Sequence, residues 1–245
     1  MRKLLLTGAA GRIGSRLIED LVDEYELTAV DKDCSSILDW AEKGCTVKEC
    51  DITRYEECLS FCEGIDTVIH LAGNPSPKAT YDEVKEVNID GTYNMMQAAK
   101  DQGCRRFIFA SSIHAVKGYL ADEQVKTTSQ VRPLDVYGVS KAFGEAMGNY
   151  FAYQEGLEVI AIRIGGHRSI EMMAERGEQP DMRQKSTYIS AKDMNQLIRR
   201  CVDAELSRPF EIVHGVSDNT FKFLDLSDTR EKVGYKPEDN GFDFE

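Results

Sequence analysis

Three glycines near the start of the chain constrain its fold more than any other feature. Gly8 and Gly11 lie between an apolar run at residues 4–6 and a helical pattern that begins at Ile13, and Gly14 lies at the start of that pattern. Glycine has no Cβ, so it permits a tight turn and lets the backbone approach a phosphate group at the start of a helix. A strand, a glycine-rich turn and a helix in this order are typical of a dinucleotide-binding unit, although a purely structural turn can show the same spacing.

Apolar runs and helical patterns alternate along the rest of the chain. Strands are expected at residues 3–7, 27–31, 67–72, 106–111, 158–164 and 211–216. Helices are expected at residues 13–24, 55–62, 81–102, 137–153 and 189–204, with a short one before Gly234. Strands that are apolar on both faces and separated by helices indicate a parallel sheet covered on both sides. The sequence therefore predicts an α/β fold with a doubly wound, Rossmann-like parallel sheet.

The last third of the chain is expected to form a small substrate-binding part. We place the dinucleotide-binding core, with the helix at 137–153, in residues 1–164, and the substrate-binding part, with a returning strand and helices, in residues 165–245. The boundary is soft, and a single domain is the alternative. The segment 167–186 is rich in charged residues and methionine and has little periodicity. Such a segment suits a mobile loop or lid over a substrate.

A carboxylate ends the second expected strand and indicates which dinucleotide is bound. Asp31 follows Gly11 by 20 residues, where it can accept hydrogen bonds from the adenosine ribose and repel a 2′-phosphate. This favours NAD over NADP, although Arg12 and Lys32 leave a cation close to such a phosphate. His70, at the end of an apolar strand, is expected to be structural. Residues farther along the chain that are also expected to line the cofactor are Asp51, Ile52, Leu71, Ala72 and Gly73.

Tyr137 and Lys141 stand four residues apart on an expected helix, so their side chains project from one face. A tyrosine with an ordinary pKa of about 10 is a poor base at neutral pH, but a fixed cation beside it stabilises the phenolate. Ser112, at the end of the strand upstream, can orient a substrate oxygen. The three residues together predict acid/base chemistry at a hydroxyl-bearing carbon, whereas a tyrosine–lysine pair alone is as easily a surface feature.

Composition excludes several classes of partner. Thirty basic and 42 acidic residues give a net charge of −12, which disfavours nucleic acids and anionic membranes as partners. No apolar run approaches the ~18 residues that cross a bilayer. The seven cysteines contain no Cys-x-x-Cys pair, and even Cys58 and Cys62, on one helical face, are expected to be buried thiols and not metal ligands. We therefore expect a cytoplasmic protein with reduced cysteines and no metal site.

Several motifs together resemble the extended short-chain dehydrogenase/reductase family, also called the NAD-dependent epimerase/dehydratase family. Besides the glycine loop they are residues 70–73 (HLAG), 88–92 (NIDGT), 109–112 (FASS), the pair Tyr137 and Lys141, and Arg163. The resemblance covers nearly the whole chain. Within the family the chain is most similar to uronate dehydrogenases and to haloarchaeal-type aldose or glucose-6-phosphate dehydrogenases.

The resemblance implies specific roles for residues of this chain. Ser112, Tyr137 and Lys141 would be the catalytic triad, and Lys141 would also hold the cofactor ribose. Ser76, Ser112, His114 and Arg183 would contact the substrate. Residues implied at the cofactor in addition to those already named are Arg12, Ile13, Asn88 and Ile164. The chain departs from the uronate dehydrogenase pattern at Ile113, where those enzymes carry asparagine, and at Gly166, where they carry a substrate-contacting serine.

Three functions remain open at this point. The first is an NAD-dependent dehydrogenase that oxidises a hydroxyl, expected at C1, of a sugar, sugar acid or sugar phosphate to the lactone. The second is a nucleotide-sugar epimerase or dehydratase, although only 104 residues follow Lys141, which is little material for burying a nucleoside diphosphate. The third is a cofactor-sensing binding protein, in which the triad would have no role. Family habit further suggests a homodimer through the helices at 81–102 and 134–153.

Overall fold

The computed structural model describes residues 1–244 and contains one seven-stranded parallel sheet. The strand order is β3-β2-β1-β4-β5-β6-β9, and every pairing between neighbours is parallel. The predicted doubly wound α/β class is therefore confirmed. The strands are β1 (Lys3–Thr7), β2 (Glu26–Asp31), β3 (Thr46–Glu49), β4 (Thr67–His70), β5 (Arg106–Ser112), β6 (Glu158–Ile164) and β9 (Phe210–Gly215).

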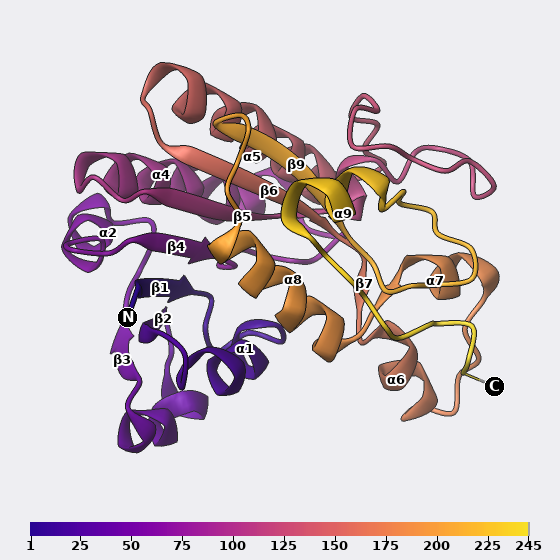
Figure 1. Cartoon of the computed structure of the whole chain (residues 1–245), viewed down its shortest axis with the longest axis horizontal. Helices are drawn as coiled ribbons and strands as arrows, with labels where there is room; N and C mark the ends of the chain where they lie inside the picture. Colours follow the sequence, from indigo (N-terminus) through magenta and orange to yellow (C-terminus); the bar gives the residue numbers. More distant parts are fainter. Residues whose placement is uncertain (245) are drawn as a thin grey trace.

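Helices cover both faces of this sheet, and each face has its own apolar core. On one face lie α1 (Gly14–Leu21), α8 (Ala191–Asp203) and α9 (Ser227–Val233), and on the other lie α2 (Tyr55–Phe61), α4 (Thr92–Asp101) and α5 (Val136–Gln154). Figure 1 shows the sheet between these two layers. Successive side chains of β1 pack alternately into the two cores: Leu4 and Leu6 lie in the first and Leu5 in the second.

Two elements near the edge of the sheet were not predicted. Strand β3 is short and largely exposed, so it carries no apolar run that a pattern analysis can detect. The 3₁₀ segment η1 (Ser35–Lys43) precedes it and ends at Gly44, whose φ of 93° lies in the left-handed region. Both belong to the rim of the sheet, where little surface is buried and the hydrophobic signal is correspondingly weak.

The helix expected at residues 81–102 is interrupted. It consists of α3 (Tyr81–Val84), a π-helical segment η2 (Lys85–Gly91) and α4. At the end of η2, Gly91 packs so closely that a Cβ there would lie 2.8 Å from Cδ1 of Ile52. Insertions of this kind are frequent at functional sites, and η2 carries Asn88, one of the residues implied at the cofactor.

The segment 167–186, expected as a loop with little regular structure, instead contains α6 (Ser169–Ala174) and α7 (Met182–Thr187). Each helix has only six residues, which is too short to produce a periodic pattern. A capping box between Asp181 and Gln184 starts α7, and the strands β7 (Gly166–His167) and β8 (Tyr188–Ile189) pair beside it. Farther along the chain, β9 joins the main sheet beside β6, and the division expected at residue 164 stays a prediction.

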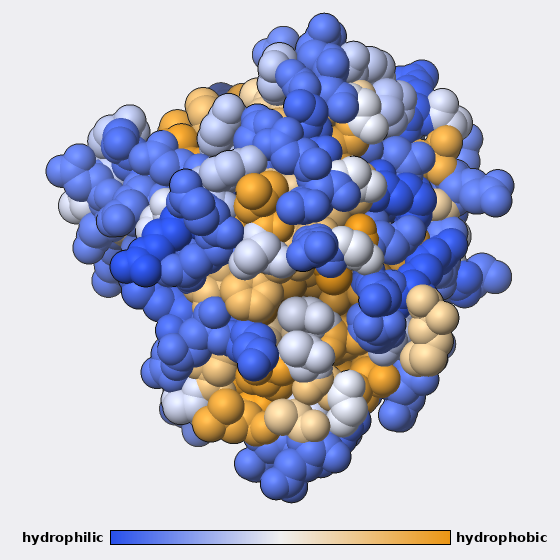
Figure 2. Space-filling view, turned by 90° about the vertical axis from the view of Figure 1, so that its left-hand side faces the viewer, coloured by the Kyte–Doolittle hydropathy of each residue, from blue (hydrophilic) through white to orange (hydrophobic). Residues whose placement is uncertain are grey.

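The two ends of the strands lead to different surfaces. The carboxyl ends point toward the side of the molecule where α6 and α7 lie, at the right of Figure 1. Figure 2 shows the opposite side, where hydrophilic residues dominate the upper part and hydrophobic residues gather in the lower middle. Within residues 1–244, no helix has the length and apolar character needed to cross a membrane. All seven cysteines are buried and free.

A buried ion pair ties β6 to α5 behind the site. The guanidinium of Arg163 donates to both carboxylate oxygens of Glu145, from Nε and Nη2, each at 2.9 Å. The Ser111 hydroxyl donates to Glu145 Oε1 at 2.6 Å. Both charged side chains are almost fully buried. In the sequence, Arg163 was noted only as part of a family motif. In the structure it joins β6 to α5 through a buried ion pair.

We expect Glu145→Ala to lower the free energy of unfolding by about 3–5 kcal/mol, because it leaves the Arg163 charge buried without its partner. The matched control is Glu238→Ala, which breaks the exposed pair with Lys192 and should lower the free energy of unfolding far less, because exposed ion pairs contribute little. Urea unfolding of the two variants measures both values. Equal losses in the two variants would contradict the role given to the buried pair.

Candidate active site

A cavity of about 1210 Å³ opens at the carboxyl ends of the parallel strands. This is the edge where open α/β sheets bind their ligands. Most of the residues predicted for the site meet in its wall, although they come from distant parts of the sequence. They are Gly8, Gly11, Arg12, Ile13, Gly14, Asp31, Asp51, Ile52, Leu71, Ala72, Gly73, Ser112, His114, Tyr137, Lys141, Ile164 and Arg183.

The glycine loop leaves a cradle that side chains would fill. Gly8 has a φ of 69°, and a Cβ there would lie 2.6 Å from the backbone nitrogen of Ala72. At Gly14 a Cβ would lie 2.3 Å from the carbonyl oxygen of Gly8. The loop leads directly into α1, whose first backbone N–H groups have no partner within the helix. This combination fits the pyrophosphate of a dinucleotide.

Two carboxylates lie farther along the same wall. Asp31 accepts hydrogen bonds from the backbone nitrogens of Ala10 at 3.0 Å and Lys32 at 2.7 Å, so its position is fixed. Asp51 pairs with Lys32 at 2.9 Å, and hydrogen bonds from Lys32 and Thr53 lower its pKa to about 2. Lys32 is one of the two cations, with Arg12, for which NADP was kept as an alternative cofactor. Its ammonium is thus engaged by a carboxylate.

Two predicted residues are not part of the cavity wall. The Asn88 side chain lies behind the wall: its Oδ1 accepts from the Asn74 backbone nitrogen at 2.7 Å, and its Nδ2 donates to Ser140 Oγ at 3.0 Å. It therefore ties the loop after β4 to α5. Ser76 uses its hydroxyl to accept from the Lys78 backbone nitrogen at 3.2 Å, within a turn. Direct contact of either residue with a ligand stays a prediction.

Tyr137 and Lys141 project into the cavity from the first turns of α5, beside Ser112. The Lys141 Nζ lies 5.7 Å from the centroid of the Tyr137 ring, and burial lowers the Lys141 pKa to about 8. Burial raises the Tyr137 pKa, and this outweighs the opposite effects of the Ser112 hydroxyl and the Arg12 charge. The net shift of the Tyr137 pKa is thus upward, because desolvation of the phenolate is the largest effect. That Lys141 lowers this pKa stays a prediction.

His114 contacts Tyr137 edge-on, with ring centroids 5.3 Å apart. Its Nδ1 lies 2.7 Å from Oδ2 of Asp135, and its Nε2 lies 3.5 Å from Nζ of Lys117. Burial lowers the pKa of His114 and outweighs the hydrogen bond that the imidazole donates to Asp135, which raises it. The imidazole is therefore neutral at pH 7. Because a carboxylate only accepts hydrogen bonds, Nδ1 carries the proton and Nε2 is an acceptor.

Arg183 reaches the cavity from α7 and is held there by uncharged groups. Its Nη2 donates to the carbonyl oxygen of Lys117 at 2.6 Å, and its guanidinium lies 4.8 Å from the centroid of the Phe223 ring. The Nε atom is buried and has no hydrogen-bond partner within residues 1–244. These contacts fix the guanidinium at the α7 side of the cavity without cancelling its charge.

Sequence reasoning missed several residues of this region. Lys117 lies in an irregular segment that carries no pattern. Asp135 accepts from the Gly138 backbone nitrogen at 2.7 Å and caps α5, a role that its place just before an expected helix could have indicated. Further residues of the cavity wall that were not predicted are His167, Arg176, Glu178, Asp181, Gln184 and Thr187.

His70 is a buried structural residue, as expected. Its Nδ1 lies 2.8 Å from Thr7 Oγ1 and its Nε2 lies 3.2 Å from Thr92 Oγ1. Burial lowers its pKa to about 3. These contacts join β1, β4 and α4 beneath the glycine loop.

We expect stability to fall as the pH falls below about 6.5, and His70→Gln to flatten this dependence. The unfolded histidine, with a pKa of about 6.5, binds a proton that the folded one, with a pKa of about 3, does not. Between these values His70 contributes a slope of up to about 1.36 kcal/mol per pH unit. Urea unfolding between pH 4.5 and 7 measures the slope. An unchanged slope in the variant would show that His70 titrates normally in the folded chain.

Comparison with known proteins identifies relatives over the full length. The model of the NAD dependent epimerase/dehydratase family matches residues 4–218. The chain is 35% identical to L-arabinose 1-dehydrogenase (NAD(P)(+)) of Haloferax volcanii, over 98% of each chain. It is also 35% identical to NAD-dependent glucose-6-phosphate dehydrogenase of the same organism, over 98% of this chain and 95% of the relative.

A solved structure is similar throughout. Uronate dehydrogenase from Agrobacterium tumefaciens superimposes with a TM-score of 0.87 at 31% identity, covering 100% of this chain and 87% of that one. A mutant of that enzyme complexed with NAD gives the same values. The similarity thus extends across the core sheet, the cavity and the α6–α7 region.

Proposed function

This chain belongs to the NAD-dependent epimerase/dehydratase family, and from that premise we propose that it oxidises a hydroxyl of a sugar-type substrate, at C1, to the lactone. The observation that carries the proposal is the convergence of Ser112, Tyr137 and Lys141 in the cavity that also contains the glycine loop. Relatives that match over 86–98% of their length include proteins named as dehydrogenases of arabinose, glucose 6-phosphate and uronates. Incubation with NAD⁺ and a panel of such sugars, with NADH absorbance as the readout, tests it.

The residues present fit a bound dinucleotide. The glycine loop would hold the pyrophosphate, Asp31 the adenosine ribose and Lys141 the second ribose. When bound, NAD⁺ supplies an acceptor for the hydride that leaves the substrate carbon. The protein's own task is then to bind the substrate, exclude water and accept one proton.

Tyr137 accepts that proton in the proposed reaction. Oxidation breaks the C1–H and O–H bonds of the substrate and forms a C=O bond, so one hydride and one proton leave. Ser112 holds the substrate oxygen, and the Tyr137 phenolate takes its proton. Because burial raises the Tyr137 pKa, the base form depends on the Ser112 hydroxyl and the Arg12 charge, which lower that pKa. We therefore expect turnover to increase with pH until the phenol is ionised.

An epimerase or dehydratase of nucleotide sugars is the alternative. It shares the fold and the tyrosine–lysine pair. The full-length relatives at 35% identity favour the dehydrogenase. Net formation of NADH with a free sugar supports the dehydrogenase, whereas conversion of a nucleotide sugar without net NADH formation supports the alternative.

We also propose that the chain forms a homodimer and is located in the cytoplasm. Tyr93 on α4 and Val139, Phe143 and Tyr150 on α5 each expose close to half of their surface. Two copies of the chain could cover this apolar face by packing these helices together, which supports a homodimer. Seven buried free cysteines fit a reducing cytoplasm, and the net charge of −12 disfavours nucleic acid.

Asp31→Ala should weaken NAD binding far more than NADP binding, because it removes an acceptor for the ribose hydroxyls and a charge that repels a 2′-phosphate. Asp33→Ala, at an exposed carboxylate outside the cavity, is the matched control and should change neither. Titration of both cofactors by fluorescence measures the dissociation constants. A parallel loss for NAD and NADP would mean that Asp31 does not set the preference.

Tyr137→Phe keeps the ring but removes the proton acceptor. We expect kcat to fall by about 10²–10⁴-fold, the usual contribution of a general base, while NAD binds nearly as before. Tyr153→Phe removes an exposed hydroxyl from the same helix and should leave kcat unchanged. Steady-state kinetics on the best substrate of the panel measures kcat of both variants. A near-normal kcat of Tyr137→Phe would show that Tyr137 is not the general base.

A further inference from the structure

Lys117 is a cation of the cavity wall that neither the sequence motifs nor the proposed chemistry uses. It follows η3 (Ile113–Ala115), the turn that carries His114, and its half-buried side chain faces the cavity. Its Nζ lies 3.5 Å from Nε2 of His114, and its carbonyl oxygen accepts from Nη2 of Arg183 at 2.6 Å. One residue thus joins the two side chains implied at the substrate.

Both cations at this end of the cavity are positioned by uncharged groups. The neutral His114 imidazole accepts from the Lys117 ammonium, and a backbone carbonyl and the Phe223 ring hold the Arg183 guanidinium. Neither side chain has an ion-pair partner within the 244 residues that the structure describes, whereas Lys32, at the adenosine end, is paired with Asp51. An uncharged partner orients a cation without neutralising it, so Lys117 and Arg183 retain their charge for a ligand.

The remaining charged groups of this region do not cancel that charge. Arg176, Glu178 and Asp181 also line the cavity, but all three are exposed at its rim. The Asp181 carboxylate is moreover engaged at the start of α7, where it accepts from the Gln184 backbone nitrogen at 2.8 Å. The Asp135 carboxylate lies on the other side of the His114 ring and is engaged by that ring and by the Gly138 backbone nitrogen. Lys117 and Arg183 are therefore half-buried cations of the cavity wall without a carboxylate partner among the described residues.

We propose that Lys117 is a specificity-determining residue that, together with Arg183, binds the phosphate group of a phosphorylated sugar. The proposal rests on the proposed function and names its substrate class. A phosphate dianion offers three terminal oxygens, enough for an ammonium and a guanidinium that approach from different elements. His114 lies between Lys117 and Tyr137, so we place the phosphate on a carbon other than the oxidised one. A neutral aldose would leave both cations without a partner, and a monoanionic uronate would use them less fully.

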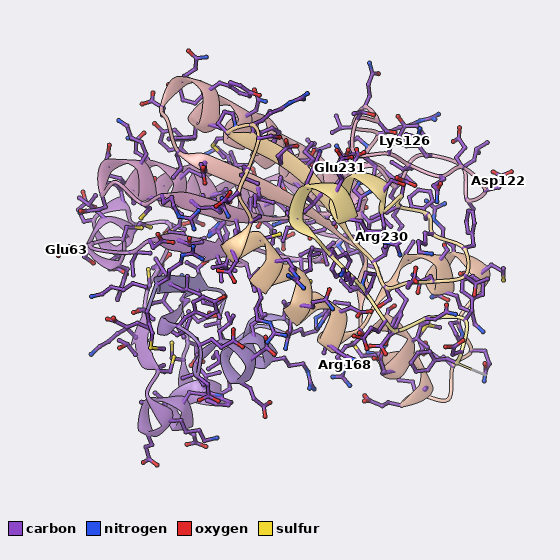
Figure 3. All side chains as sticks on the ribbon, viewed as in Figure 1. Glu63, Asp122, Lys126, Arg168, Arg230 and Glu231 are labelled. Carbon is purple, nitrogen blue, oxygen red and sulfur yellow. The ribbon has the colours of Figure 1, made fainter. Side chains whose placement is uncertain are left out.

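The test compares glucose, glucuronate and glucose 6-phosphate as substrates at saturating NAD⁺. We expect kcat/KM to be highest for glucose 6-phosphate. Lys117→Met should raise KM for glucose 6-phosphate about 10- to 100-fold, the effect of one hydrogen bond to a charged group, with kcat little changed. KM for glucose should stay the same, and Lys117→Arg should retain most of the wild-type preference. Lys126→Met is the control, since this exposed lysine lies on the loop at the upper right of Figure 3, outside the cavity wall.

Two kinetic results would overturn the proposal. One is a wild-type enzyme that prefers glucose or glucuronate to glucose 6-phosphate. The other is a Lys117→Met variant whose KM for glucose 6-phosphate is unchanged, or whose kcat/KM falls equally for glucose, since the residue would then act on the fold or on His114 and not on the phosphate. Either result leaves the dehydrogenase function in place if any sugar is oxidised.

A binding measurement separates this inference from the proposed function. Calorimetric titration with inorganic phosphate, in the presence of saturating NADH so that the glycine loop is occupied, should show binding to the wild type and at least tenfold weaker binding to Lys117→Met. Absence of phosphate binding to the wild type overturns the proposal. Phosphate binding that depends on Lys117, without turnover of any sugar, supports the anion site and overturns the dehydrogenase.

Discussion

The close approach of the glycine loop to the end of β4 is the constraint on which the rest of this structure depends. At Gly8 and Gly14 the backbone passes so near to Ala72 and to the loop itself that no side chain fits. This contact sets where α1 starts relative to β1 and β4. The start of α1, the end of β2 with Asp31, and the loop after β4 therefore enclose one cavity.

A second constraint operates at the opposite side of the cavity. The Asp135 carboxylate caps α5 with one oxygen and binds His114 with the other. The same group thus fixes the start of the helix that carries Tyr137 and the tautomer of the imidazole beside it. Because that imidazole then accepts from Lys117, Tyr137, His114 and the two cations Lys117 and Arg183 form one connected arrangement. Its polar contacts are short-range and are largely shielded from solvent by the burial of Tyr137 and Lys141.

The sequence predicted the features that depend on local pattern or motif. The buried strands, the glycine loop, Asp31 and the pair Tyr137 and Lys141 were all located in advance, because apolar periodicity and fixed spacing report on them directly. Strand β3, the π segment η2 and the short helices α6 and α7 were not, since each depends on tertiary packing or is too short to leave a pattern. Lys117 was not predicted as a site residue for the same reason. Its role follows from what lies near it in space, and the raised pKa of Tyr137 likewise depends on burial that no spacing reveals.

The central claim is that hydride leaves C1 of a sugar for the bound NAD⁺ while Tyr137 takes the proton of the same hydroxyl. The most direct measurement uses the best sugar substrate deuterated at C1 and follows the label in both products by mass spectrometry. Hydride transfer from C1 predicts one deuterium in each reduced cofactor molecule, an unlabelled lactone and a slower turnover when C–H cleavage limits the rate. Reduced cofactor without deuterium, or a converted sugar that keeps its label with no net reduction of NAD⁺, would contradict it.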